Sequence, residues 1–210
     1  ISDDLGLRDR ILGRLEKRVT AEIERSETKS LEDSEILGAL QEVVSNGQVA
    51  SVVRSRSENF ELTLQEFHWL DKHEESDWVD YLVHRYKFRI FPPLQKVANF
   101  PPYLLIEPTS VCNLRCVMCF QIDETFTRDK SMMGLMSWEL FTSVVDQAAE
   151  NGCQAITMAS RGEPTLHKRF GEMLHYIRKK GFLDTKINTN ATRLNEILIR
   201  DILGSEVANV

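Results

Sequence analysis

The spacing of apolar residues changes at about residue 98, and before that point it predicts helices. Three series of apolar residues recur there at intervals of three or four positions, which is the spacing of one buried face of an amphipathic helix. Ser76 is the expected N-cap of the third helix, and Pro92-Pro93 ends it. Residues 48–62 fit a short strand or a loop, because valine and serine dominate there. The three series are Ile11, Leu15, Val19 and Ile23; Ile36, Leu40, Val43 and Val44; and Trp78, Leu82, Tyr86 and Ile90.

After Pro101-Pro102 the pattern alternates between short apolar runs and amphipathic helices. This order predicts an α/β fold with parallel strands joined by right-handed crossovers. About half of an α/β barrel has the same order, so we predict a helical N-terminal region of unknown role over residues 1–98 and half a barrel over 99–210. The expected strands are 103–107, 154–160, 185–188 and a fourth beginning at 206, in which the chain ends; the expected helices are 137–151, 168–180 and 193–203.

Three unusual loops follow the first three predicted strands. The first contains the cysteines of "CNLRCVMC", the second reads "SRGEP" over 160–164, and the third reads "NTNAT" over 188–192. Ligands of parallel α/β folds bind at the carboxyl ends of the strands. The shared position of the three loops therefore predicts one site.

The first loop carries Cys112, Cys116 and Cys119 in the pattern Cys-x3-Cys-x2-Cys. Clustered thiolates favour a soft metal or an iron–sulfur cluster. The spacing differs from that of zinc ribbons and of bacterial ferredoxins. A cluster held by three cysteines leaves one iron open to an exogenous chelating group, whereas a zinc site would need a fourth ligand such as His167. Cys153 is expected at the opposite end of the second strand, as a small buried residue.

Composition and charge narrow the class of protein. The 210 residues are 42% hydrophobic and 28% charged, which is typical of a globular protein. A net charge of −6 makes nucleic acid an unlikely partner. No apolar run reaches the roughly 18 residues that a membrane span requires. The start lacks the apolar core of a secretory signal, and the few clustered cysteines do not form a disulfide framework, so a cytoplasmic location is expected.

The cysteine pattern after a strand, followed by the "GEP" loop after the next strand, resembles the radical S-adenosylmethionine (radical SAM) superfamily. The resemblance covers about residues 103–210, and "IEPTSVCNLRC" is similar to the branch whose members often carry a cysteine-rich SPASM domain. It implies the first half of the TIM-like (β/α) barrel of this superfamily. It also implies an enzyme, because members cleave S-adenosylmethionine reductively and use the 5′-deoxyadenosyl radical to abstract hydrogen from a substrate.

The resemblance also implies cofactors, site residues and partners. Cys112, Cys116 and Cys119 would hold a [4Fe–4S] cluster whose open iron chelates S-adenosylmethionine. The substrate would be a peptide, a sugar or a cofactor precursor, and the reductant a protein such as flavodoxin or ferredoxin. The alternative is a zinc- or cluster-binding structural or interaction domain without turnover. The residues expected around S-adenosylmethionine are Gly162, Glu163 and Pro164 beside its amine, Asn190 beside its ribose, and Met118 beside its adenine.

Several positions depart from the pattern of the superfamily or lie outside it. Met118 stands where many members have an aromatic residue, but a thioether can also pack on a purine. Arg161 stands where a second glycine is common, and it fits either a carboxylate or phosphate of the cofactor or substrate, or free solvent. Arg115 fits either a charge partner of the cluster or a surface residue. Residues 120–137 form a long insert that is a candidate lid, although its methionines fit core contacts better.

Overall fold

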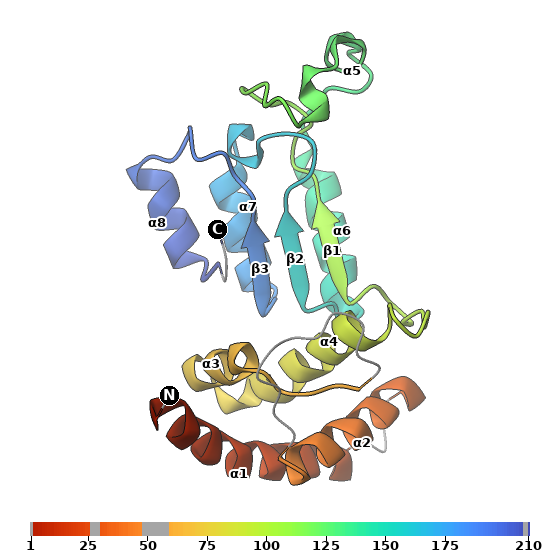
Figure 1. Cartoon of the computed structure of the whole chain (residues 1–210). Helices are drawn as coiled ribbons and strands as arrows, with labels where there is room; N and C mark the ends of the chain where they lie inside the picture. The colour runs from red at the N-terminus through yellow and green to blue at the C-terminus, as the bar shows by residue number, and fades with distance from the viewer. Residues whose placement is uncertain (1, 26–29, 48–58, 208–209) are drawn as a thin grey trace. The chain divides into compact units, whose positions relative to one another are not determined.

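The computed structural model describes residues 2–25, 30–47, 59–207 and 210. It divides the chain into two compact units, Ile1–Asn99 and Phe100–Val210 (Figure 1). Each unit has its own buried core. No helix within the described ranges is long and apolar enough to cross a membrane.

The first unit is helical, as its apolar spacing predicts. The periodic side chains face inward, and Ile11, Leu15 and Val19 are at most 1% exposed. A capping box formed by Thr63 and Glu66 begins the third helix. The Thr63 side chain accepts from the backbone N–H of Glu66, and the Glu66 side chain accepts from the backbone N–H of Thr63 at 2.9 Å. The helices are α1 (Ser2–Glu24), α2 (Leu31–Ser45), α3 (Leu64–Lys72) and α4 (Trp78–Ile90), with a short 3-10 helix at Glu75–Asp77.

Two predictions for this unit, the N-cap of α4 and the structure of residues 48–62, are not confirmed. The prediction that Ser76 caps α4 is wrong, because Glu75–Asp77 forms a 3-10 turn and Asp77 takes the N-cap position. Within the segment 48–62, residues 48–58 lie outside the described part of the chain. The end of that segment lies in the core, where Phe60 and Leu62 are at most 3% exposed.

The second unit is built on a parallel three-stranded sheet in the order β1-β2-β3. The strands are β1 (Tyr103–Ile106), β2 (Ala155–Met158) and β3 (Asp184–Ile187). Across the sheet, Leu105 pairs with Thr157, which in turn pairs with Lys186. These strands confirm the first three predicted ones. The expected fourth strand includes residues 208–209, which the structure does not describe, and Val207 beside them is not in a strand.

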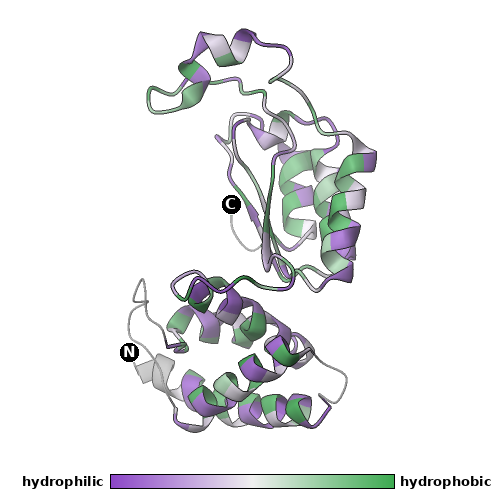
Figure 2. Ribbon diagram, turned by 90° about the vertical axis from the view of Figure 1, so that its right-hand side faces the viewer, coloured by the Kyte–Doolittle hydropathy of each residue, from purple (hydrophilic) through white to green (hydrophobic). Residues whose placement is uncertain are grey.

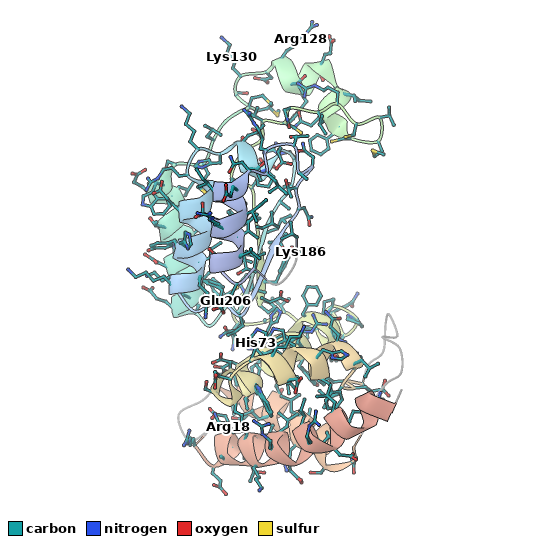
Figure 3. The ribbon with its side chains drawn as sticks, turned by 90° about the vertical axis from the view of Figure 1, so that its left-hand side faces the viewer. Arg18, His73, Arg128, Lys130, Lys186 and Glu206 are labelled. Carbon is teal, nitrogen blue, oxygen red and sulfur yellow. The ribbon has the colours of Figure 1, made fainter. Side chains whose placement is uncertain are left out.

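One face of this sheet is covered by helices, and the other is left open by the described part of the unit. Figure 2 shows the helices on one side of the strands. Ile106, Ile156 and Ile187 point toward the helices and are at most 4% exposed. Lys186 belongs to the alternate set of side chains and projects from the opposite face (Figure 3). The covering helices are α6 (Trp138–Glu150), α7 (Phe170–Lys179) and α8 (Glu196–Gly204).

The insert after the cysteines projects beyond the carboxyl ends of the strands (Figure 1). It contains a 3-10 helix at Phe120–Ile122 and the short helix α5 (Glu124–Arg128), which Asp123 caps. It returns to the sheet through an antiparallel bridge between Thr109 and Leu135. Of its methionines, Met136 packs against the core, in line with the expected core contacts, whereas Met132 is 49% exposed.

Candidate functional site

The loops after β1, β2 and β3 meet at the carboxyl edge of the sheet. Parallel pairing forces this arrangement, because all three strands end on the same side. Hydrogen bonds then join the loops to one another: Glu163 N–H donates to Val111 O at 2.9 Å, and Asn190 Nδ2 donates to Asn113 Oδ1 at 3.0 Å. The three loops of the sequence prediction thus form one connected site.

The three clustered cysteines are free thiols on the first loop. Cys116 is exposed, whereas Cys112 and Cys119 are half-buried. A turn closes between the last two, where Cys119 N–H donates to Cys116 O at 2.9 Å. In the part of the chain that the structure describes, no three histidine, cysteine, aspartate or glutamate residues are gathered as a ready-made metal site. The donor set itself, three accessible sulfurs within eight residues, is the set that an iron–sulfur cluster takes.

The sulfur of Cys112 already receives hydrogen bonds from the chain. Leu114 N–H lies 3.5 Å from this sulfur, and Asn190 Nδ2 lies 3.9 Å from it. Both groups are donors, and hydrogen bonds to the ligand sulfurs are a feature of iron–sulfur sites. The environment of Cys112 therefore fits a metal-bound sulfur.

The base of the cysteine loop is clamped by residues that the sequence pattern did not single out. Gln121 is 1% exposed, and its amide nitrogen donates to Ser110 O at 2.8 Å and to Arg161 O at 2.7 Å. Ser110 exchanges hydrogen bonds with Gly134, with its hydroxyl accepting from Gly134 N–H at 2.8 Å. These contacts tie the first loop to both the insert and the second loop.

Gly162 brings the second loop against the first. A Cβ atom at this position would overlap the carbonyl group of Thr109 and lie 2.7 Å from Val111 O, which no side chain tolerates. The backbone that approaches this glycine is that of the cysteine loop. The prediction that it also borders a cofactor stays a prediction.

Glu163 is buried at 3% exposure, so it is not the exposed loop carboxylate that its position would otherwise suggest. One carboxylate oxygen accepts from Thr165 N–H at 3.1 Å and from the hydroxyls of Thr165 at 2.5 Å and Thr189 at 2.6 Å. The other oxygen accepts from Asn190 N–H at 2.7 Å. The carboxylate therefore joins the loops after β2 and β3.

Arg161 pairs with Glu107 at the end of β1. Its guanidinium makes a bidentate contact with the carboxylate, with nitrogen–oxygen distances of 2.6 and 2.9 Å. The backbone N–H of Arg161 donates to the same carboxylate at 2.8 Å. Burial alone would raise the pKa of Glu107, but the hydrogen bonds and charge of Arg161 hold this pKa below its ordinary value. In the structure Arg161 is paired with a carboxylate of this chain, an arrangement that neither interpretation of this residue included.

The remaining candidates differ in how they are held. Met118 is 85% exposed, so its thioether is free to meet a ligand. Arg115 donates to Cys112 O and Leu114 O, both at 2.9 Å, and so closes the cysteine loop on itself.

His167 has hydrogen bonds at both ring nitrogens. Nδ1 accepts from Arg169 N–H at 3.2 Å, which leaves the proton on Nε2 to donate to Met136 O at 3.0 Å. His167 is therefore not placed as a fourth metal ligand.

Cys153 is separated from the other cysteines by the length of β2. It lies in the core at 3% exposure, and burial raises the pKa of its thiol. Its sulfur faces Ala155 O at 3.5 Å. The prediction of a small buried residue is confirmed.

Comparisons with known proteins identify the family. This chain is 37% identical over 101 residues to a tungsten-containing aldehyde ferredoxin oxidoreductase cofactor-modifying protein of Pyrococcus furiosus, and the match covers 48% of this chain and 27% of that protein. It is also 34% identical over 101 residues to a cysteine-type anaerobic sulfatase-maturating enzyme of Clostridium novyi, covering 44% of this chain and 27% of that protein. It is 30% identical over 109 residues to an Fe-coproporphyrin III synthase of Methanosarcina barkeri, covering 52% of this chain and 26% of that protein.

The chain thus spans about a quarter of the length of these relatives. No solved structure gives a significant match. The family model of the radical SAM superfamily matches residues 106–210, which begin at the end of β1 and include all three loops of the site. The chain therefore belongs to the radical SAM superfamily.

Proposed function

We propose that this chain is part of a radical SAM enzyme that binds a [4Fe–4S] cluster and S-adenosylmethionine at the carboxyl edge of its parallel sheet. The cluster, when bound and reduced, supplies the electron that cleaves S-adenosylmethionine, and the 5′-deoxyadenosyl radical abstracts hydrogen from the substrate. The observation that carries this proposal is the convergence of the cysteine loop with the loops after β2 and β3, which are joined by Glu163 and Asn190.

Each site residue has a proposed part that follows from its position. Cys112, Cys116 and Cys119 hold the cluster through their sulfurs. The exposed Met118 packs on the adenine of S-adenosylmethionine. The loop of Gly162, Glu163 and Pro164, together with Asn190, borders the position of this cofactor, because these residues lie against the cysteine loop.

The surrounding architecture is the second part of the proposal. We propose that Phe100–Val210 forms the first half of a (β/α) barrel, in which the open face of the sheet is the interior. The exposed side chains Leu105 and Lys186 on that face would then line the space in which the substrate binds. Residues 1–98 remain a helical region without an assigned role.

The substrate class and partners rest on the relatives. One is named for modifying a cofactor, one for maturing a sulfatase and one for making a coproporphyrin. These names support a peptide or a cofactor precursor as substrate, while a sugar stays a prediction, and they support the likeness to the SPASM-type branch. We also propose a flavodoxin- or ferredoxin-type reductant and a cytoplasmic location.

Anaerobic reconstitution with iron and sulfide tests the proposal. We expect a brown protein with about four irons per chain, since a cubane cluster contains four, and release of 5′-deoxyadenosine when dithionite and S-adenosylmethionine are added to the full-length protein. Cys116→Ala should lose both the colour and the product. The matched control is Cys153→Ala, which should keep both. Stoichiometric zinc without iron in anaerobically purified protein would instead support the structural-domain alternative.

A further inference from the structure

The side-chain amide of Asn190 has all of its hydrogen-bonding positions occupied by other groups of this chain. Its amide nitrogen donates to Asn113 Oδ1 at 3.0 Å and approaches the sulfur of Cys112 at 3.9 Å. Its amide oxygen accepts from Thr192 N–H at 3.0 Å and from the Thr192 hydroxyl at 2.7 Å. An amide offers two N–H groups and two lone pairs, so all four are occupied. A bond to a ribose hydroxyl would have to displace one of them.

Glu163 holds Asn190 in this orientation. Its carboxylate accepts from the backbone N–H of Asn190 and from the hydroxyl of Thr189, which both lie in the loop after β3. Because the carboxylate is 3% exposed, water does not compete for these donors. The loop after β3, from which Asn190 reaches Cys112, is therefore anchored to the loop after β2 through Glu163.

The chemistry at this position calls for a carboxylate. Two backbone N–H groups approach different oxygens of Glu163: that of Thr165 on one and that of Asn190 on the other. A carboxylate accepts at both oxygens, whereas the amide of glutamine accepts at one and would present N–H to the second donor. Glutamine has nearly the same shape, so it removes one anchor with little change in volume.

We propose that Asn190 is a positioning residue that donates an N–H group to the sulfur of Cys112, that Glu163 fixes it there, and that the pair raises the reduction potential of the cluster. The inference rests on the proposed function, since it requires Cys112 to be a cluster ligand. Reduction adds negative charge to the cluster and its sulfurs. A hydrogen bond to a ligand sulfur stabilises the reduced form more than the oxidised form and so shifts the potential upward.

The test is the midpoint potential of the reconstituted cluster, measured by an anaerobic redox titration followed by electron paramagnetic resonance. Asn190→Ala removes the donor, and we expect its midpoint potential to be more negative than that of the wild type. Glu163→Gln should shift it in the same direction by a smaller amount, because Asn190 remains but loses one anchor. Asn190→Gln, which keeps an amide donor, should recover part of the shift.

Thr192→Val is the matched control. It removes a hydroxyl from the same loop network but leaves the N–H groups of Asn190 in place, so it should lower the unfolding temperature without moving the potential. An unchanged potential in Asn190→Ala with a normal cluster content would overturn the inference and leave the proposed function intact. Failure of the wild type to bind any cluster would instead overturn the proposed function itself.

Discussion

The Cα atom of Gly162 lies directly against the carbonyl group of Thr109, with no room for a Cβ atom between the loops after β2 and β1. Both neighbours are backbone, so neither can rotate away as a side chain would. We predict that Gly162→Ala costs about 1–3 kcal/mol of unfolding free energy, the usual range for overpacking. Urea unfolding followed by circular dichroism measures the change.

Gly134→Ala is the control for this prediction. Gly134 also contacts the cysteine loop, but a Cβ atom there would meet nothing within 4 Å. It should therefore change the unfolding free energy by less than about 0.5 kcal/mol. The Gly162 variant should in addition bind less iron on reconstitution, because the base of the cysteine loop is displaced. Equal stability of the two variants would contradict the close approach.

The ion pair between Glu107 and Arg161 predicts a dependence of stability on pH. The pKa of Glu107 is lowered in the folded chain, so its contribution is present above its ordinary pKa of 4.5 and is lost as the pH falls through the folded value. The arginine side chain is 43% exposed, so the contribution should be about 1 kcal/mol or less.

Glu107→Gln measures this contribution. We expect the variant to be less stable than the wild type at pH 7. The difference should shrink as the pH falls below 4.5 and through the lowered pKa of Glu107, because the carboxyl of the wild type then becomes protonated as well. Urea unfolding over a series of pH values from 7 downward gives these differences, and a difference that stays constant through the acid titration of the folded protein would assign the role of Glu107 to shape rather than charge.

The elements of the second unit were predictable because local signals mark their ends. Ser137 appears in the sequence as a cap, and in the structure its hydroxyl accepts from Leu140 N–H at 3.1 Å at the start of α6. The short apolar runs became β1, β2 and β3 within about two residues of their expected limits. Asp123 followed by Glu124 is a similar signal, and it would have revealed α5 inside the insert.

The contacts that assemble the site were not predictable, because they join residues far apart in the sequence. Gln121 bonds to a carbonyl 40 positions away, and Glu163 to residues 26 and 27 positions away. Neither residue stands in a periodic pattern, and no local rule distinguishes a glutamine that ties two loops from one in solvent. The resemblance to the superfamily gave the region of Glu163, but its burial and partners required the fold.

A buried carboxylate in the first unit carries the next prediction. Glu66 is fully buried, and it accepts from Arg85 Nε at 3.0 Å and from Thr63 N–H at 2.9 Å. Glu66→Ala leaves the largely buried guanidinium of Arg85 without this partner, so we expect a loss of about 3–5 kcal/mol. Two of the three tryptophans, Trp69 and Trp78, lie in this unit, so urea unfolding followed by tryptophan fluorescence reports mainly on it.

Glu35→Ala provides the comparison for Glu66. Glu35 also pairs with a cation, Lys96 at 3.0 Å, but its side chain is 70% exposed. Its removal should cost no more than about 1 kcal/mol. If the two variants lost similar amounts of stability, the buried ion pair would have no special part in holding α3 against α4.

The four cysteines should differ in their reactivity toward an alkylating reagent. Cys112, Cys116 and Cys119 are exposed or half-buried, whereas Cys153 is buried and the pKa of its thiol is raised. The thiolate is the reactive form. In the reduced, metal-free protein at pH 8, iodoacetamide should therefore modify the three loop cysteines first, and Cys153 only in denaturant.

Peptide mass spectrometry after timed alkylation identifies the modified residues. Reconstitution with the cluster should then protect the three loop cysteines together, since bound sulfurs are no longer nucleophiles, while Cys153 stays unreactive in both states. The two states thus separate protection by the fold from protection by metal. Modification of Cys116 at the same rate in metal-free and reconstituted protein would show that its sulfur is not a ligand, because a ligand sulfur cannot react without leaving the cluster.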